Sequence, residues 1–187
     1  MRISLHGTGD GLRVRMRLDV NRRRWLAVQI ILGVLLAVAL FTGLWATFAP
    51  HSFYTSFPGF GMRWVQPDGP YNHHLTGDVG AFFLALGAVT AAALWFLDSL
   101  LARVAGLAWL VFGVPHLIYH ALHKPEAMGG VSFTLSLLSV LLLPALGAAL
   151  ILVAPRERTR VPEPNDLTFR FPRRGKSARG LGNRPPR

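Results

Sequence analysis

The stretch WLAVQIILGVLLAVALFTGLWATF, residues 25–48, decides the fold of this chain. Its only polar residues are Gln29, Thr42 and Thr47, and a tryptophan lies near each end, where indole rings favour the membrane interface. A helix of this length, rising about 1.5 Å per residue, crosses a hydrocarbon core of about 30 Å. The stretch therefore predicts a transmembrane helix.

A cleaved secretory signal is the alternative, because residues 22–24 are all arginine and directly precede the apolar stretch. The stretch is far longer than the apolar region of a signal peptide, which spans about 7–15 residues. The best cleavage position, after Ala49, is a poor one because Pro50 follows it. We therefore expect this helix to remain as a membrane anchor.

Three further apolar stretches follow, at residues 79–97, 104–120 and 131–153. The first of these is rich in Gly and Ala, which let helices approach closely in lipid. Pro115 interrupts the next stretch, and Pro144 is expected to kink the last. Together with the first stretch they predict an all-α membrane protein, a four-transmembrane-helix bundle.

Both ends of the chain are strongly basic, and the formal net charge is +11 although 51% of the residues are hydrophobic. Residues 1–24 hold seven Arg, and residues 154–187 hold ten Lys or Arg among several Pro and Gly. Such segments bury too little apolar surface to offset the entropy of ordering, so we expect disordered basic termini. The alternation of apolar and polar residues within residues 12–20 is typical of a short strand. We expect the part after Arg160 to bind anionic bilayers.

The same charge asymmetry predicts the topology. The loops at residues 49–75 and 121–130 contain one Lys or Arg each, far fewer than the two ends. Because Lys and Arg are retained on the cytoplasmic side, we expect both termini in the cytoplasm and both loops outside the cytoplasmic membrane. The first loop is long and rich in aromatic residues, and is predicted to lie along the membrane surface or to fold back over the bundle.

Six of the seven histidines gather on the outer side of this topology. His116 and His120 are four residues apart, as are His74 and Asp78, so each pair shares one helix face. The tight turn between the second and third spans makes these spans antiparallel neighbours, and we expect the two pairs to converge. Imidazoles with a carboxylate would suit a divalent transition metal, and imidazole also suits haem or a proton-responsive site. The histidines around these four are His51, His73 and His123.

Structural roles for the same residues stay open. Asp78 lies near the start of its helix, where a capping carboxylate is favoured, and His120 and His123 lie near a helix C-terminus, which favours cations. Asp98 and Arg103 are expected to form an interfacial pair in the turn between the second and third spans.

Two segments carry a resemblance: GPYNHHLTGDVG at residues 69–80 and PHLIYH at residues 115–120 look like stretches of small actinobacterial membrane proteins. The layout of residues 25–153 resembles the broad DoxX-like group of four-helix membrane proteins. That resemblance implies a four-helix bundle in the cytoplasmic membrane and membership of a redox-linked complex that involves oxidoreductases and quinones. The chain has no Cys, so the resemblance implies no thiol chemistry here.

The leading expectation is an accessory or structural subunit of a membrane complex, with a membrane-protein partner or as a homo-oligomer. The first alternative is a metal-, haem- or quinone-binding redox-linked subunit, and the second is an oligomeric transporter. The sequence contains no nucleophile–base pair, phosphate-binding loop or paired carboxylates, which disfavours a stand-alone enzyme. Nucleic acid is not needed as a partner, because basic segments beside a membrane attract anionic lipid by about 1 kcal/mol per residue.

Overall fold

The computed structural model describes residues 2–8, 11–17, 22–155 and 166–170. They belong to two compact units. The first unit contains a three-stranded antiparallel sheet in the order β1 (Arg2–Thr8), β2 (Gly11–Arg17) and β5 (Asp166–Arg170). In its register Leu5 pairs with Val14, and Val14 pairs with Leu167.

These strands differ from the expectation that both termini lack regular structure. Apolar and polar residues alternate in all three, with the period of two that is typical of strands. The strand that the sequence allowed within residues 12–20 corresponds to β2. The remainder of the tail that was predicted to be disordered lies outside the described residues.

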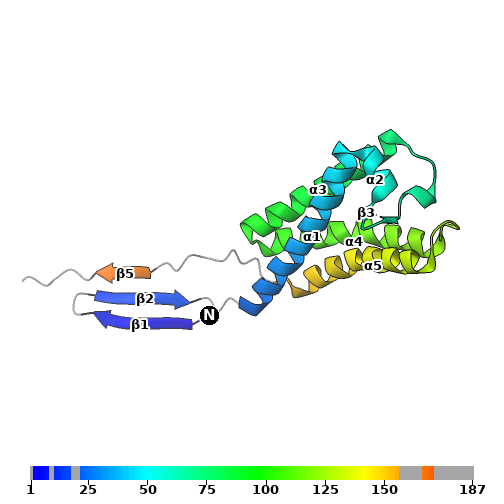
Figure 1. The fold of residues 1–187 in the computed structure, drawn as a ribbon. Helices are drawn as coiled ribbons and strands as arrows, with labels where there is room; N and C mark the ends of the chain where they lie inside the picture. Colours follow the sequence, from blue (N-terminus) through cyan, green and yellow to red (C-terminus); the bar gives the residue numbers. More distant parts are fainter. Residues whose placement is uncertain (1, 9–10, 18–21, 156–165, 171–187) are drawn as a thin grey trace, which may run out of the picture. The chain divides into compact units, whose positions relative to one another are not determined.

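The second unit is a four-helix bundle made of long apolar helices, and it confirms the predicted fold class (Figure 1). The helices are α1 (Arg22–Phe48), α3 (His73–Phe96), α4 (Ser99–Leu122) and α5 (Gly130–Val153). Large apolar side chains point outward all around it, among them Trp95 (84% exposed) and Leu152 (76% exposed). This surface suits lipid rather than water, so the chain is a multi-pass membrane protein.

The helices start earlier or end later than their apolar stretches suggest. Asn72 caps α3, because its side chain accepts a hydrogen bond from the Leu75 amide at 3.0 Å. Asp98 caps α4 by accepting from the amides of Leu100 and Leu101 at 2.8 and 3.3 Å. Side-chain oxygens satisfy amides that a helix start leaves unpaired. The cap of α3 is therefore Asn72 and not Asp78.

Arg103 reaches across to the end of α5 instead of forming the turn pair expected with Asp98. Its guanidinium donates to the carbonyl groups of Ala154 and Pro155. These carbonyls lie at the end of a helix, where the last carbonyl groups lack partners within the helix and cations are favoured. Arg103 thus ties α4 to the end of α5.

Small residues allow α1 to pack closely on α3 and α4 on α5. Gly80 of α3 lies against Thr47 of α1. A Cβ atom added to Gly106 would lie 2.7 Å from the carbonyl oxygen of Gly147, so the backbones of α4 and α5 are in direct contact there. Close backbone approach at Gly is a common way for helices to associate in lipid.

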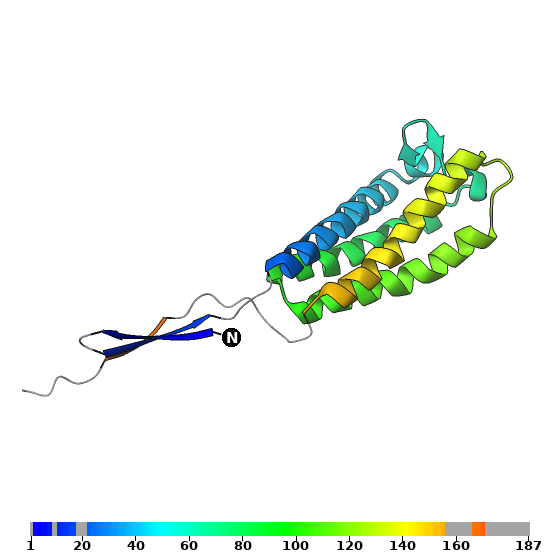
Figure 2. The ribbon, with the colours of Figure 1, turned by 90° about the horizontal axis from the view of Figure 1, so that it is seen from below.

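The two ends of the bundle differ. The start of α1, the end of α5 and the turn between α3 and α4 lie at one end, which we call the terminal end (Figures 1 and 2). Residues 49–72, here called the long loop, and residues 123–129 lie at the opposite end, called the loop end. Four spans place both bundle termini at the same end, as the sequence predicts.

A candidate ligand-binding cavity at the loop end

The long loop has regular structure of its own. It contains α2 (Pro50–Ser56), the two-residue strands β3 (Pro58–Gly59) and β4 (Met62–Arg63), and the 3₁₀ helix η1 (Gln66–Asp68). Gly59 at the end of β3 and the two turn residues Phe60 and Gly61 all have positive φ. Glycine adopts this backbone without strain, which explains its place on both sides of the turn.

Side-chain hydrogen bonds hold the long loop over the bundle. The indole Nε1 of Trp64 donates to the hydroxyl of Ser132 on α5 at 2.9 Å. Within the loop, the Tyr54 hydroxyl donates to the Gly69 carbonyl at 2.7 Å. The loop is therefore fixed to a transmembrane helix and also braced internally.

Aromatic rings of the long loop pack on one another and on α1. The ring centroids of Phe53 and Phe57 are 4.6 Å apart, and Phe57 lies 6.1 Å from Trp45 and 6.0 Å from Phe41. Aromatic pairs at 4.5–7 Å are attractive. Of the two arrangements predicted for this loop, the one that folds back over the bundle is confirmed.

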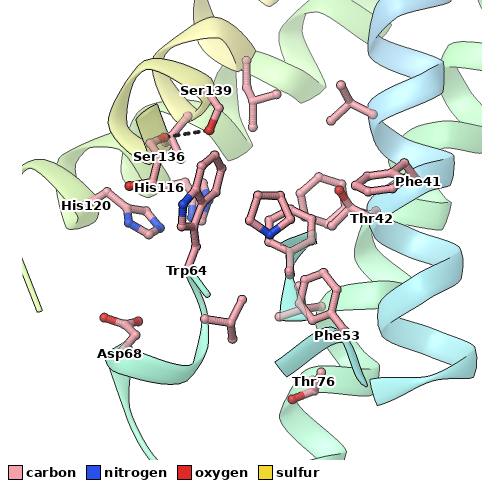
Figure 3. A pocket seen from close by; sticks show the side chains of 18 of the residues that line it. Phe41, Thr42, Phe53, Trp64, Asp68, Thr76, His116, His120, Ser136 and Ser139 are labelled. Atoms are coloured by element: carbon pink, nitrogen blue, oxygen red, sulfur yellow. Dashed lines mark hydrogen bonds between the residues drawn. The ribbon is translucent and has the colours of Figure 1, made fainter. Parts of the chain in front are cut away.

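Beneath the long loop lies a cavity of about 540 Å³ between the four long helices (Figure 3). His116, His120 and Asp68 come from one side of it, and Phe41, Thr42 and Phe53 face them from the other. Most of its wall is aliphatic or aromatic. The remaining lining residues are Val38, Phe57, Pro58, Trp64, Val65, Leu75, Thr76, Val79, Phe83, Ser136, Ser139, Val140, Leu142 and Leu143.

Three hydroxyl groups on the wall already donate to backbone carbonyls. Thr76 donates to Asn72 at 2.8 Å, and Ser136 and Ser139 donate to Phe133 and Ser136 at 2.9 and 2.7 Å. Such bonds satisfy a hydroxyl within its own helix, which is how Ser and Thr are accommodated in transmembrane helices. Each of these hydroxyls has used its one donor hydrogen, but its oxygen can still accept a hydrogen bond.

The imidazoles of His116 and His120 form the polar side of the cavity. Their centroids are 4.7 Å apart, and the ring of His116 stacks on Phe112 at 5.2 Å. Neither ring has a hydrogen-bonding partner among the described residues. No nitrogen of either ring is both buried and unpaired, so these nitrogens remain accessible. Asp68 of η1 lies near enough to act on His120 through its charge. The two rings are thus available to a molecule in the cavity.

His74 and Asp78 also form a pair, but it lies elsewhere. The imidazole Nε2 of His74 is 3.4 Å from a carboxylate oxygen of Asp78, and their side chains are 89% and 49% exposed. On α3 the cavity is lined by Leu75, Thr76, Val79 and Phe83, so the His74–Asp78 pair lies off the cavity wall. Both predicted pairs exist, but only His116 and His120 reach the cavity.

The four residues predicted to bind a metal do not assemble into one site. In the part of the chain that the structure describes, no three His, Cys, Asp or Glu side chains form a group able to hold a metal ion. The physical reason is that His74 and Asp78 are not among the α3 residues that line the cavity, whereas His116 and His120 of α4 are. A tetrahedral site needs at least three protein ligands in one first shell, and the geometry supplies two pairs.

The surrounding histidines pack against tyrosines. His51 and Tyr71 have centroids 5.3 Å apart, and His73 lies 6.4 Å from Tyr71. His123 ends α4: its amide donates to the Tyr119 carbonyl, and its ring stacks on Tyr119 at 4.5 Å. The structural role that the sequence left open is thus confirmed for His123.

Sequence reasoning did not single out Asp68, Trp64, Thr42 and Ser139 as cavity residues. Ser136 and Ser139 gave a signal, because they are three residues apart in an otherwise apolar helix. Polar residues inside spans tend to be functional. Nothing in the sequence indicated that Asp68 and Trp64 line the cavity, because their positions depend on how the long loop folds.

No family model, curated protein or solved structure matches this chain. The likeness to DoxX-like proteins therefore stays a prediction.

Proposed function

We propose that this protein is a small accessory subunit of the cytoplasmic membrane that binds a lipophilic small molecule in the loop-end cavity. The observation that carries the proposal is the pairing of apolar walls with two unengaged imidazoles. Small-molecule sites are typically cavities of about 300–1,000 Å³, mostly apolar, with a few convergent polar groups that orient the ligand. The volume of about 540 Å³ and the lining of this cavity fit that description.

The position of the cavity supports a ligand that dissolves in the bilayer. Its walls come from all four long helices, and the long loop covers it with Phe53, Phe57 and Trp64. Aromatic and aliphatic walls gain free energy from the burial of apolar surface. A quinone-like or other lipid-soluble molecule fits this setting. A quinone would also agree with the redox-linked subunit that the sequence analysis gives as an alternative.

The test is to purify the chain in mild detergent, extract bound lipophilic molecules and identify them by mass spectrometry. Ser139→Phe places a large ring in the cavity, whereas Leu138→Phe makes a comparable change at a neighbouring, 56% exposed position that does not line it. We expect the extracted ligand to fall several-fold in Ser139→Phe and to stay unchanged in Leu138→Phe. Equal amounts in all three proteins would refute the proposal. Metal analysis and a visible spectrum of the same samples address the metal and haem alternatives.

The proposed orientation places both termini in the cytoplasm and the cavity near the outer surface. It rests on the positive-inside rule. Residues 1–24 hold seven Arg and residues 154–187 hold ten Lys or Arg, whereas the loops at residues 49–75 and 121–130 hold one each. We also propose that these basic ends bind anionic lipid. A reporter fused after Arg187 that is active only outside the cell would contradict the orientation. Unchanged binding to neutral and anionic vesicles would contradict the lipid partner.

A further inference from the structure

The charge of the cavity wall restricts the head group of the ligand. Among the residues that the structure describes, Asp68, His116 and His120 are the ionisable side chains on the wall, and no Lys or Arg lies there. A carboxylate or phosphate in the cavity would have no cation beside it and would lie near Asp68. Burial of an unpaired charge costs several kcal/mol.

The hydrogen-bonding capacity of the wall restricts the head group further. The hydroxyls of Thr76, Ser136 and Ser139 donate to backbone carbonyls, and the indole of Trp64 donates to Ser132. Among the described residues, the imidazoles of His116 and His120 and the hydroxyl of Thr42, on the opposite side of the cavity, remain without a hydrogen-bonding partner. A neutral imidazole offers one N–H donor and one acceptor nitrogen, which matches a carbonyl or a hydroxyl group.

We infer that the cavity takes an uncharged lipophilic molecule whose carbonyl or hydroxyl head hydrogen-bonds to His116 and His120, and that it rejects fatty acids and phospholipids. The inference rests on the proposed function and specifies its ligand class. Haem fits less well, because its two carboxylates would find no basic partner on the described wall. An apolar chain on the ligand would lie along the aliphatic and aromatic walls toward Phe41 and Val38.

Two probes of equal chain length test the inference at pH 8: 2-undecanone, labelled with ¹³C at the carbonyl, and undecanoate. Binding to the purified full chain in detergent is measured against Ser139→Phe, which corrects for partition into micelles. We expect the ketone to bind at least about tenfold more tightly, since each 1.4 kcal/mol of the cost of burying a charge is a factor of ten. Isotope-edited infrared spectra should show a bound carbonyl band shifted to lower frequency by hydrogen bonding.

Substitutions test whether the bound carbonyl is hydrogen-bonded to His116 and His120. His116→Leu with His120→Leu should abolish the shifted band, and His74→Leu, a matched change at an exposed histidine off the cavity, should leave it. Asp68→Asn should improve undecanoate binding about two- to fivefold, the range of an exposed charge–charge interaction, without changing ketone binding. Because Asp68 is exposed and lies in the long loop, this variant keeps the test decisive if the double histidine variant fails to fold.

The binding results distinguish a failure of the inferred ligand class from a failure of the proposed function. Equal affinity for undecanoate and the ketone overturns the inference and leaves the proposed function standing. A shifted band that survives the double histidine variant, or unchanged undecanoate binding in Asp68→Asn, also overturns the inference. If neither probe binds the native chain better than Ser139→Phe, the proposed function fails as well.

Discussion

The indole Nε1 of Trp109 donates a hydrogen bond of 2.9 Å to the hydroxyl of Thr90, which joins α4 to α3 in a fully buried place. The same hydroxyl donates onward to the Leu86 carbonyl at 2.7 Å. Thr90→Val should leave the indole N–H without its acceptor and lower the free energy of unfolding by about 1 kcal/mol. Thermal unfolding in detergent checks this. Thr90→Ser keeps the hydroxyl and should restore most of the loss; an equal loss in both would contradict a role for the bond.

The contact of Gly106 with Gly147 should be intolerant of any side chain. Gly106→Ala would place a Cβ 2.7 Å from the Gly147 carbonyl oxygen, and the helices would have to separate at a cost of about 1–3 kcal/mol. Gly33→Ala on α1 meets nothing within 4 Å, so it should be neutral or stabilising by up to about 1 kcal/mol. Unfolding curves of the two variants test the pair. Similar melting temperatures would show that α4 and α5 do not depend on this contact.

The bond from Trp64 to Ser132 should control how often the long loop opens. Arg63 is exposed, directly precedes Trp64, and is the only Lys or Arg in this loop, so trypsin has one cutting position there. Trp64→Phe keeps a ring but removes the donor, and cleavage after Arg63 should accelerate about fivefold, which corresponds to about 1 kcal/mol. Ser132→Ala should have the same effect, whereas Trp95→Phe, at an outward position, should have none. Unchanged cleavage in both loop variants would rule out control by this bond.

Removal of residues 161–187 should leave the bundle as stable as before. The helices form a unit with its own core, built on fully buried residues such as Leu32, Leu35, Trp109 and Leu150. We expect the melting temperature to change by less than about 2 °C, because changes outside a core shift stability by about 0.5 kcal/mol or less. A drop of more than about 5 °C would show that the tail supports the bundle.

The spans were predictable because a membrane demands a length and an apolar composition that few other structures share. Their ends were harder to predict. Helix α3 begins at His73, six residues before its apolar stretch, because Asn72 caps it and its first turn carries polar residues. No hydropathy pattern contains that information.

The cavity was predictable only in part, for a reason that follows from the solvent. The spacing of His116 and His120 places them together, and the structure agrees. Which face of a span points inward is not encoded by apolar periodicity, since lipid and core are both apolar. The sequence could therefore not predict that His74 and Asp78 lie off the cavity wall, or that Trp64 and Asp68 of the long loop contribute to it.

The glycine contact between α4 and α5 has a consequence for how such a protein can diverge. Gly106 lies ten residues from His116, and Gly147 lies eleven from Ser136, which is about 15 Å along each helix. At this contact the packing of α4 on α5 is set by backbone atoms that lie well away from His116 and Ser136 of the cavity wall. If the cavity binds a ligand as proposed, substitutions on its wall would change the ligand preference while the Gly106–Gly147 contact stays the same. Selection can then act on recognition and on assembly as separate traits.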